Sequence, residues 1–331
     1  MAEAPPVRYK VTFRLLSPLQ VGAGTHGMVE RTLLYVPGRL LWAAMTKALA
    51  EECYPTYDHA HYVQAGTALC GKSAKHFGTL FLSFDGRTPI IPTAKHPTEL
   101  AEAKHPCKAA GPVAEDHSQL WWWEKGGEGR YWSDAAFRSI VLGSEAAQST
   151  DPERMATEEA SLHEVMVMLP RVRLSRDADP SDVHVVGYFE IAQGASVNRK
   201  TIDEDLLKTR VFSRVRFGGG RTRGRGRVEL VILEQLSDSQ PLQPLQYDEF
   251  CSGKYRRMLR AVPVKADQQA TGRVFLAAYR EWVAQGQNEH VGPGRCVDRA
   301  APLCWEPGTV FTVQPETVAA PQMAHSCADV A

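Results

Sequence analysis

The stretch RVRFGGGRTRGRGRV, residues 214–228, combines six arginines and five glycines in a chain that carries no net charge. Arginine forks match phosphate oxygens in bidentate geometry, and glycines let the backbone adopt positive φ and approach a ligand closely. This combination predicts a phosphate-binding loop, with a solvated basic hairpin as the alternative. The expected contacts are Arg214, Arg216, Gly218, Gly219, Gly220, Arg221, Arg223, Gly224, Arg225 and Arg227.

The residues that follow this loop exclude two common phosphate-binding motifs. A Walker loop needs Gly-Lys-Ser or Gly-Lys-Thr at the start of a helix, whereas here the loop leads into the strand-like segment RVELVILEQL. A dinucleotide-binding fingerprint also opens a helix and is excluded for the same reason. Any phosphate contact must therefore come from the arginines and the backbone amides themselves.

A second glycine-rich segment, VGAGTHG at residues 21–27, follows the first apolar segment of the chain. It contains His26, which in a flexible loop is a candidate acid or base. A structural or surface role is the alternative for a single histidine. We include Gly22, Gly24, His26, Arg31 and Arg39 among the candidate ligand contacts.

Metal and catalytic motifs are largely missing from the sequence. Cys53, His59, His61 and Cys70 are potential zinc ligands, but the chain contains no CxxC pair. It also contains no GxSxG, HExxH or kinase-type motif. The sequence therefore predicts no metal, no cofactor and no catalytic residue, with zinc at these four residues as the alternative.

Three consecutive tryptophans, Trp121, Trp122 and Trp123, form the most aromatic part of the chain. Adjacent side chains diverge in either a helix or a strand, so we expect at least one ring to reach the surface. Exposed aromatic rings commonly mark interfaces, and the triplet is predicted to contact a protein partner or RNA. Packing inside a core is the alternative.

The composition is that of a globular protein, with 44% hydrophobic and 23% charged residues and 38 basic against 38 acidic side chains. A polyanion site must therefore be a local patch. Seven scattered cysteines favour a reducing compartment. The N-terminal segment does not resemble a signal peptide, and no apolar run is long enough to span a membrane, so we expect a cytoplasmic protein with no membrane partner.

The hydrophobic pattern predicts an α+β fold. Apolar residues alternate over 7–15, and helical spacing begins after the Pro-Gly turn at 37–38. We expect an N-terminal domain at 1–160 with an insertion at about 51–160, and a second unit at 161–240 that ends with the basic loop. Residues 241–331 are expected to form a helical extension and a loose tail.

Three segments in this order, RLLSPLQVGAG, LLYVPGRLLWAAMTKAL and RVRFGGGRTRGRGRVEL, resemble the RAMP superfamily of CRISPR–Cas proteins. Residues 80–108 and 172–197 are most similar to the larger RAMP subunit of type III-D complexes, which caps the 5′ end of the guide RNA. Arg39 stands where the superfamily usually has serine. The resemblance implies tandem ferredoxin-like (RRM-like) domains with a large insertion.

This resemblance also implies a function. We expect a non-catalytic subunit of a type III effector complex in antiviral defence, which holds the 5′ repeat-derived handle of a guide crRNA. Its partners would be the large signature subunit, backbone RAMP subunits and, at further sites, target RNA. The alternatives are a metal-independent endoribonuclease with His26 as base, and a backbone subunit that cleaves target RNA with metal at Asp58 or Asp85.

Overall fold

The structure is a computed structural model, and it describes most of the first 237 residues and shorter segments beyond them. The described residues are 5–56, 58–70, 77–95, 120–124, 130–147, 150–151, 156–157, 163–237, 248–251, 255–259, 262–264, 270–276, 280–281, 284–285, 289–290, 296–297 and 303–312. They form several sheets, in which most strand pairs are antiparallel and β3 (Val29–Thr32) pairs with β12 (His163–Met168) in parallel, and four α-helices, so the α+β class is confirmed. None of the described helices is long and apolar enough to cross a membrane.

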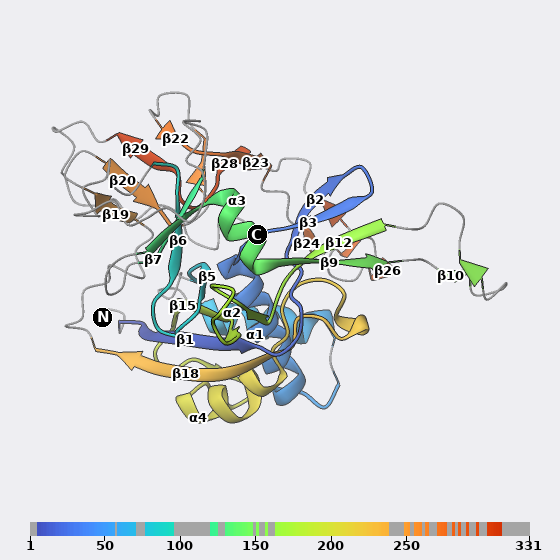
Figure 1. Cartoon of the computed structure of the whole chain (residues 1–331). Coiled ribbons are helices and arrows are strands. Elements are labelled where there is room, and N and C mark those ends of the chain that lie inside the picture. Colours follow the sequence, from blue (N-terminus) through green and yellow to red (C-terminus); the bar gives the residue numbers. More distant parts are fainter. Residues whose placement is uncertain are drawn as a thin grey trace.

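A five-stranded sheet forms the centre of the fold (Figure 1). Its strands, in spatial order, are β18 (Val228–Leu236), β1 (Val7–Leu15), β15 (His184–Ile191), β5 (Leu80–Ser83) and β4 (Tyr35–Val36), and all neighbours are antiparallel. With α1 (Gly38–Cys53) and α4 (Glu204–Leu206), strands β1, β5, β15 and β18 follow the β-α-β-β-α-β order of a ferredoxin-like unit.

This sheet combines strands from both segments for which the sequence predicts separate units. β1 and β5 come from the predicted N-terminal domain, and β15 and β18 come from the predicted second unit. The chain enters other sheets both between β1 and β4, at residues 22–32, and between β5 and β15. The predicted insertion at about 51–160 stays a prediction. A tandem arrangement of two ferredoxin-like units stays a prediction.

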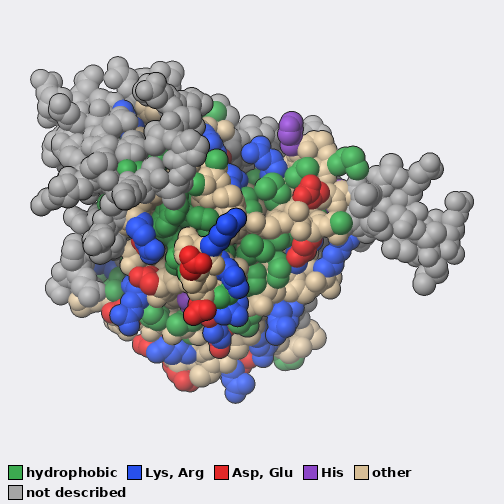
Figure 2. Space-filling view, in the orientation of Figure 1, with side chains coloured by type: hydrophobic (Ala, Val, Ile, Leu, Met, Phe, Trp, Pro, Cys, Tyr) green, Lys and Arg blue, Asp and Glu red, His purple; other side chains and the backbone are tan. Residues whose placement is uncertain are grey.

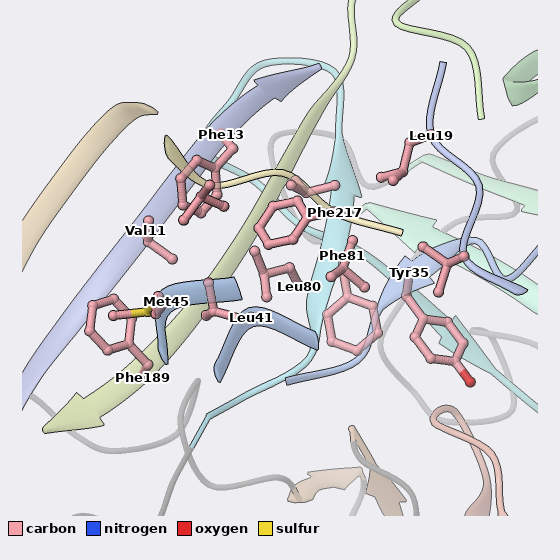
Figure 3. Close-up of a cluster of buried hydrophobic side chains, with 14 of the residues drawn as sticks. Val11, Phe13, Leu19, Tyr35, Leu41, Met45, Leu80, Phe81, Phe189 and Phe217 are labelled. Atoms are coloured by element: carbon pink, nitrogen blue, oxygen red, sulfur yellow. The ribbon is translucent and has the colours of Figure 1, made fainter. Parts of the chain in front are cut away.

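The core lies between this sheet and α1. Alternate residues of β1, such as Val11 and Phe13, are fully buried, as are Leu41 and Met45 at helical spacing along α1 (Figure 3). Phe13 also meets Phe217 edge to face, with ring centroids 5.3 Å apart. The start of the basic loop is therefore anchored in the core.

A second, four-stranded sheet extends from the body (Figure 1). Its order is β2 (Gly22–His26), β3 (Val29–Thr32), β12 (His163–Met168) and β9 (Leu142–Ala147). The prediction of a loop at 21–27 is wrong, because β2 pairs with β3 as a hairpin. Gly24 and Gly27 have φ of 87° and 59°, so the glycines that suggested a loop supply the conformations of an irregular strand and its turn.

The tryptophan triplet forms the central strand of a three-stranded sheet. Its strands are β6 (Ile90–Thr93), β7 (Trp121–Glu124) and β8 (Arg130–Ser133), followed by α3 (Asp134–Val141). The expectation that one ring reaches the surface is wrong, since Trp121, Trp122 and Trp123 are only 8%, 1% and 4% exposed. Phe137 of α3 stacks on Trp122, and Arg257 covers the ring of Trp123. Both faces of the strand are therefore occupied.

All the helices or strands among the described residues after 240 are strands, so the prediction of a helical C-terminal extension is wrong for them. One sheet is β19 (Asp248–Cys251), β20 (Tyr255–Met258), β29 (Val310–Thr312) and β22 (Ala270–Thr271), and another is β21 (Val262–Pro263), β28 (Leu303–Trp305) and β23 (Val274–Leu276). β20 places Arg257 against the tryptophan sheet, and Gly308 accepts a hydrogen bond from the amide of Ala94. The strands after residue 240 are thus in tertiary contact with the tryptophan sheet, and such contacts favour an extended conformation.

The remaining elements are short apart from one helix, α2 (His59–Cys70), which packs on α1. They are β10 (Thr150–Asp151), β11 (Ala156–Thr157), β13 (Arg171–Val172), β14 (Ser181–Asp182), β16 (Ser196–Val197), β17 (Lys200–Thr201), β24 (Arg280–Glu281), β25 (Ala284–Gln285), β26 (Glu289–His290) and β27 (Cys296–Val297).

Candidate nucleic-acid interface

The basic loop, residues 214–228, is hydrogen-bonded to the Ser-Pro-Leu-Gln segment that follows β1. The amide of Arg227 donates to Ser17 Oγ, and the amides of Gly226 and Gly219 donate to the carbonyls of Pro18 and Gln20, each at 2.9 Å. These two segments, which are far apart in sequence, therefore form a single structural unit.

Two glycines of the basic loop are required by backbone packing within this unit. Gly218 and Gly226 have φ of 73° and 71°. A Cβ at Gly218 would lie 1.9 Å from the carbonyl oxygen of Gln20, and one at Gly226 would lie 1.8 Å from that of Phe217. The backbone at Gly218 therefore contacts the protein itself, and the expectation that its missing side chain admits a ligand is wrong.

Gly219, Gly220 and Gly224 complete the turn. Gly220 and Gly224 flank the short helical turn Arg221–Arg223 and both have positive φ. A Cβ on Gly220 would press on the Arg225 side chain, while Gly224 has open space around it. Gly219 and Gly224 are the exposed glycines of the loop, and of these two only Gly224 has open space where a Cβ would lie.

Arg225 has a structural position, which corrects its prediction as an RNA contact. Its side chain is buried; Nη2 lies 2.7 Å from Glu145 Oε2, and Nη1 donates to Gln20 Oε1 at 3.1 Å. Gln20 in turn donates to Glu30 on β3, and Glu30 pairs with His163 on β12. This polar network fixes the basic loop to the second sheet and uses the guanidinium that the sequence assigned to a ligand.

The other arginines of the basic loop are exposed: Arg214, Arg216, Arg221, Arg223 and Arg227. Three of them, Arg214, Arg216 and Arg221, line a groove of about 620 Å³ against α1, which we call the α1–loop groove. Its other lining residues are Ala44, Lys47, Ala48, Glu51 and Thr222. Arg223 and Arg227 lie outside the lining.

The charge of the α1–loop groove is positive. Lys47 pairs with Glu51 at 3.5 Å, and Arg214 pairs with Glu52 at 2.9 Å. Among the described residues, Arg216 and Arg221 form no ion pair. On the face shown in Figure 2, basic and acidic side chains are interspersed, so positive charge is local rather than spread over the molecule. Two exposed guanidinium groups beside an open groove are suited to bind phosphates.

Sequence reasoning missed the contribution of α1 to this groove. Ala44, Lys47, Ala48 and Glu51 recur at helical spacing, and Leu41, Met45 and Leu49 are buried at other positions of the same helix. The two alanines with a lysine at helical spacing were the signal in the sequence that this face of α1 could line a groove. Nothing in the sequence indicated that this helix and the basic loop form the two walls of one groove.

The candidate ligand contacts predicted in the N-terminal part of the sequence lie outside the α1–loop groove. Gly22, Gly24 and His26 are exposed on β2, Arg31 is exposed on β3, and Arg39 is exposed at the start of α1. None of these five residues lines the α1–loop groove. In the described part of the chain, no acid or base lies within hydrogen-bonding distance of the His26 ring. The structure therefore does not bring His26 together with the basic loop.

The described structure gives contacts for several of the candidate metal ligands. The described residues contain no group of three or more His, Cys, Asp or Glu side chains that could hold a metal ion. Asp58 accepts the amide of His61 at the start of α2, and the His61 ring stacks on Tyr54. The Cys53 thiol is buried, which raises its pKa.

Asp85 stabilises the turn after β5. Its carboxylate accepts hydrogen bonds from the amides of Arg87 and Thr88 and from the hydroxyls of Ser83 and Thr88. Partial burial alone would raise the pKa of Asp85, but these hydrogen bonds outweigh it and lower the pKa to about 2. All the observed contacts of this carboxylate are thus local.

Comparisons with known proteins give structural neighbours but no sequence match. No family model matches the chain, and no curated protein matches it. Among solved structures, a chain of a type III-B Cmr-beta complex bound to cognate target RNA and AMPPnP aligns with 92% of this chain and 86% of its own, at 12% identity and a TM-score of 0.49.

Two further structural neighbours have lower TM-scores. A chain of the apo type III-B Cmr-beta complex covers 70% of this chain and 98% of its own, at 11% identity and a TM-score of 0.37. A CRISPR protein from Archaeoglobus fulgidus covers 93% and 92%, at 10% identity and a TM-score of 0.28. All three TM-scores are below 0.5.

Proposed function

We propose that this chain is a guide-RNA-binding subunit of a type III CRISPR–Cas effector complex, and that the α1–loop groove contacts the RNA backbone. One observation carries the proposal. The Ser-Pro-Leu-Gln segment and the basic loop, two of the three segments that resemble RAMP proteins, form one hydrogen-bonded unit beside that groove.

The third segment that resembles RAMP proteins, LLYVPGRLLWAAMTKAL, also reaches the α1–loop groove. The Val-Pro-Gly turn begins α1, and a Cβ at Gly38 would lie 1.7 Å from the carbonyl oxygen of Phe77. This glycine allows α1 to begin close against the backbone that leads into β5. The helix then presents Lys47 to the groove, so two of the three segments line the groove and the Ser-Pro-Leu-Gln segment holds the basic loop in place.

The chemistry of the groove suits a phosphodiester backbone rather than a particular base. Its cationic groups are the guanidiniums of Arg214, Arg216 and Arg221 and the ammonium of Lys47, which bind phosphates regardless of sequence. The residues that line it include no histidine and no aromatic side chain. The proposed role is accordingly to hold RNA and not to cut it.

The finer assignment rests on the sequence resemblance. We propose that the bound segment is the 5′ repeat-derived handle of the guide crRNA, and that the large signature subunit and a backbone RAMP subunit are neighbours. The tryptophan triplet, although buried, belongs to a sheet that is contacted by Arg257, and Ala94 after β6 donates a hydrogen bond to Gly308. A docking role for that region is part of the same proposal.

The test uses the full chain, labelled single-stranded repeat RNA and a series of salt concentrations. Arg216→Ala with Arg221→Ala should weaken binding and reduce the slope of log Kobs against log[salt] by about 1.4, since each lost phosphate contact removes about 0.7. Arg173→Ala with Arg176→Ala is the matched control, because both arginines are exposed and lie outside the groove.

Two outcomes would overturn the proposal. Equal effects of the two double variants would mean that the groove is not the binding site. Metal-independent cleavage of the repeat RNA by the protein, abolished in His26→Ala, would place the chain among the processing endoribonucleases instead.

A further inference from the structure

The hairpin of β16 and β17 places an arginine in a backbone conformation that favours glycine. Its two-residue turn is Asn198-Arg199, with φ of 47° and 65°, and these are the two non-glycine residues with positive φ in the described structure. Turns of this geometry favour Asn-Gly, because a side chain at the second position is strained. Asparagine occupies its usual position, but arginine replaces the favoured glycine.

The hairpin is held firmly against the body, so the position of Arg199 is fixed. Val197 and Ile202, on either side of the turn, are buried, and the amide of Ile202 donates to the carbonyl of Ala195 at 2.8 Å. Asn198 Nδ2 donates to the carbonyl of Cys53 at 2.7 Å, at the end of α1. Packing thus fixes the turn, while none of these contacts requires the guanidinium of Arg199.

The same hairpin is connected to the α1–loop groove through one carboxylate. Glu52 of α1 lies 3.3 Å from Lys200 Nζ with one oxygen and 2.9 Å from Arg214 Nη2 with the other. Arg214 lines the groove, and Lys200 directly follows Arg199. Two cations share one carboxylate here, so positive charge continues from the groove to the hairpin.

Arg199 itself is exposed, and among the described residues it forms no hydrogen bond or ion pair. A strained backbone that is retained without any internal contact of its side chain indicates a role for that side chain outside the protein. An exposed guanidinium at the end of a positively charged path is suited to an additional phosphate.

We propose that Arg199 is a second anchoring point for the RNA bound in the α1–loop groove, contacting a phosphate beyond those held by Arg216 and Arg221. This inference rests on the proposed function and extends it. The RNA strand then runs from the groove past Arg214 and the end of α1 to the β16–β17 hairpin. Its ligand is a single-stranded RNA backbone, with no reading of base sequence at Arg199.

The test is Arg199→Gly in the full chain, because glycine removes the charge and also the strain. We expect a thermal midpoint at or above that of the unmodified protein. Affinity for single-stranded repeat RNA should fall about three- to tenfold, and the salt slope should fall by about 0.7. Arg199→Lys keeps one positive charge and should retain the slope. Arg176→Ala is the control for removing an exposed arginine elsewhere.

The outcomes separate this inference from the proposed function. A loss of affinity in both Arg199→Gly and the groove variant supports both. Unchanged affinity and slope in Arg199→Gly, with the groove variant still impaired, would overturn the second anchoring point alone. If the groove variant and Arg199→Gly both bind like the unmodified protein, the proposed function fails as well.

Discussion

Arg225 of the basic loop and Glu145 of β9 form an ion pair, with Nη2 and Oε2 2.7 Å apart. The arginine is buried and the carboxylate is partly exposed, so the pair closes the space between the loop and the second sheet. An exposed position would have left this guanidinium free for a ligand. Its contacts instead stabilise the loop that carries the exposed arginines.

The first prediction separates this structural role from a ligand contact. Arg225→Lys should lower the free energy of unfolding by about 1–3 kcal/mol, because an ammonium lacks the planar fork by which Nε and Nη2 contact Glu145 while Nη1 contacts Gln20. Chemical denaturation of the purified variant measures this change. The lysine keeps the charge, so a variant of normal stability with weakened RNA binding would show that Arg225 acts on RNA directly.

The second prediction compares two glycines of the basic loop. Gly218→Ala should cost at least about 3 kcal/mol, since its Cβ would overlap the carbonyl oxygen of Gln20. Gly224→Ala should cost only about 1–2 kcal/mol, because its positive φ is strained but the space is open. Thermal denaturation of both variants checks the order. Equal costs would contradict the close contact between the loop and Gln20.

The third prediction concerns two carboxyl groups whose pKa values are shifted in opposite directions by the fold. Burial alone would raise the pKa of Asp134, but the nearby Arg138 and the hydrogen bond from Trp122 outweigh it, and the pKa is lowered. Burial raises the pKa of Glu306, and Arg273 only partly offsets this. The ionised form therefore stabilises the fold at Asp134 and destabilises it at Glu306.

The sign of each effect follows from these directions. Asp134 contributes stability above its ordinary pKa and loses it as pH falls through the lowered value, so Asp134→Asn should be most destabilising at neutral pH. Glu306→Gln should be stabilising at neutral pH, and its advantage should disappear as pH falls and the native carboxyl takes up a proton. Unfolding free energies measured from pH 3 to 7 distinguish the two. Parallel pH profiles for both variants would refute the assignment.

Local patterns predicted the elements that depend on nearby residues. The alternation through Val11 and Phe13 predicted β1, the Pro-Gly turn and helical spacing predicted α1, and the apolar run after the basic loop predicted β18. In each of these cases, side-chain periodicity and turn residues in one short window determine the conformation. The α+β class followed from these elements.

The features that sequence reasoning missed depend on residues far apart in the chain. Arg225 is buried because Glu145 and Gln20 reach it, and neither partner is close to it in sequence. Trp123 is buried because Arg257 covers it, from a segment whose own pattern suggested a helix. Composition suggested that the basic loop binds a ligand, which stays a prediction, but it could not show which arginine turns inward.

The placement of β1 has a consequence for synthesis of the chain. β1 is an interior strand of the central sheet, and its two neighbours there are β15 and β18. At roughly 5–20 residues per second, the ribosome needs on the order of ten seconds or more after making β1 before β15 emerges. During that interval β1, which carries Val11 and Phe13, has no neighbouring strand to pair with. The nascent chain therefore presents an apolar strand edge early, and chaperone binding or association with its own α1 must protect it until the sheet can close.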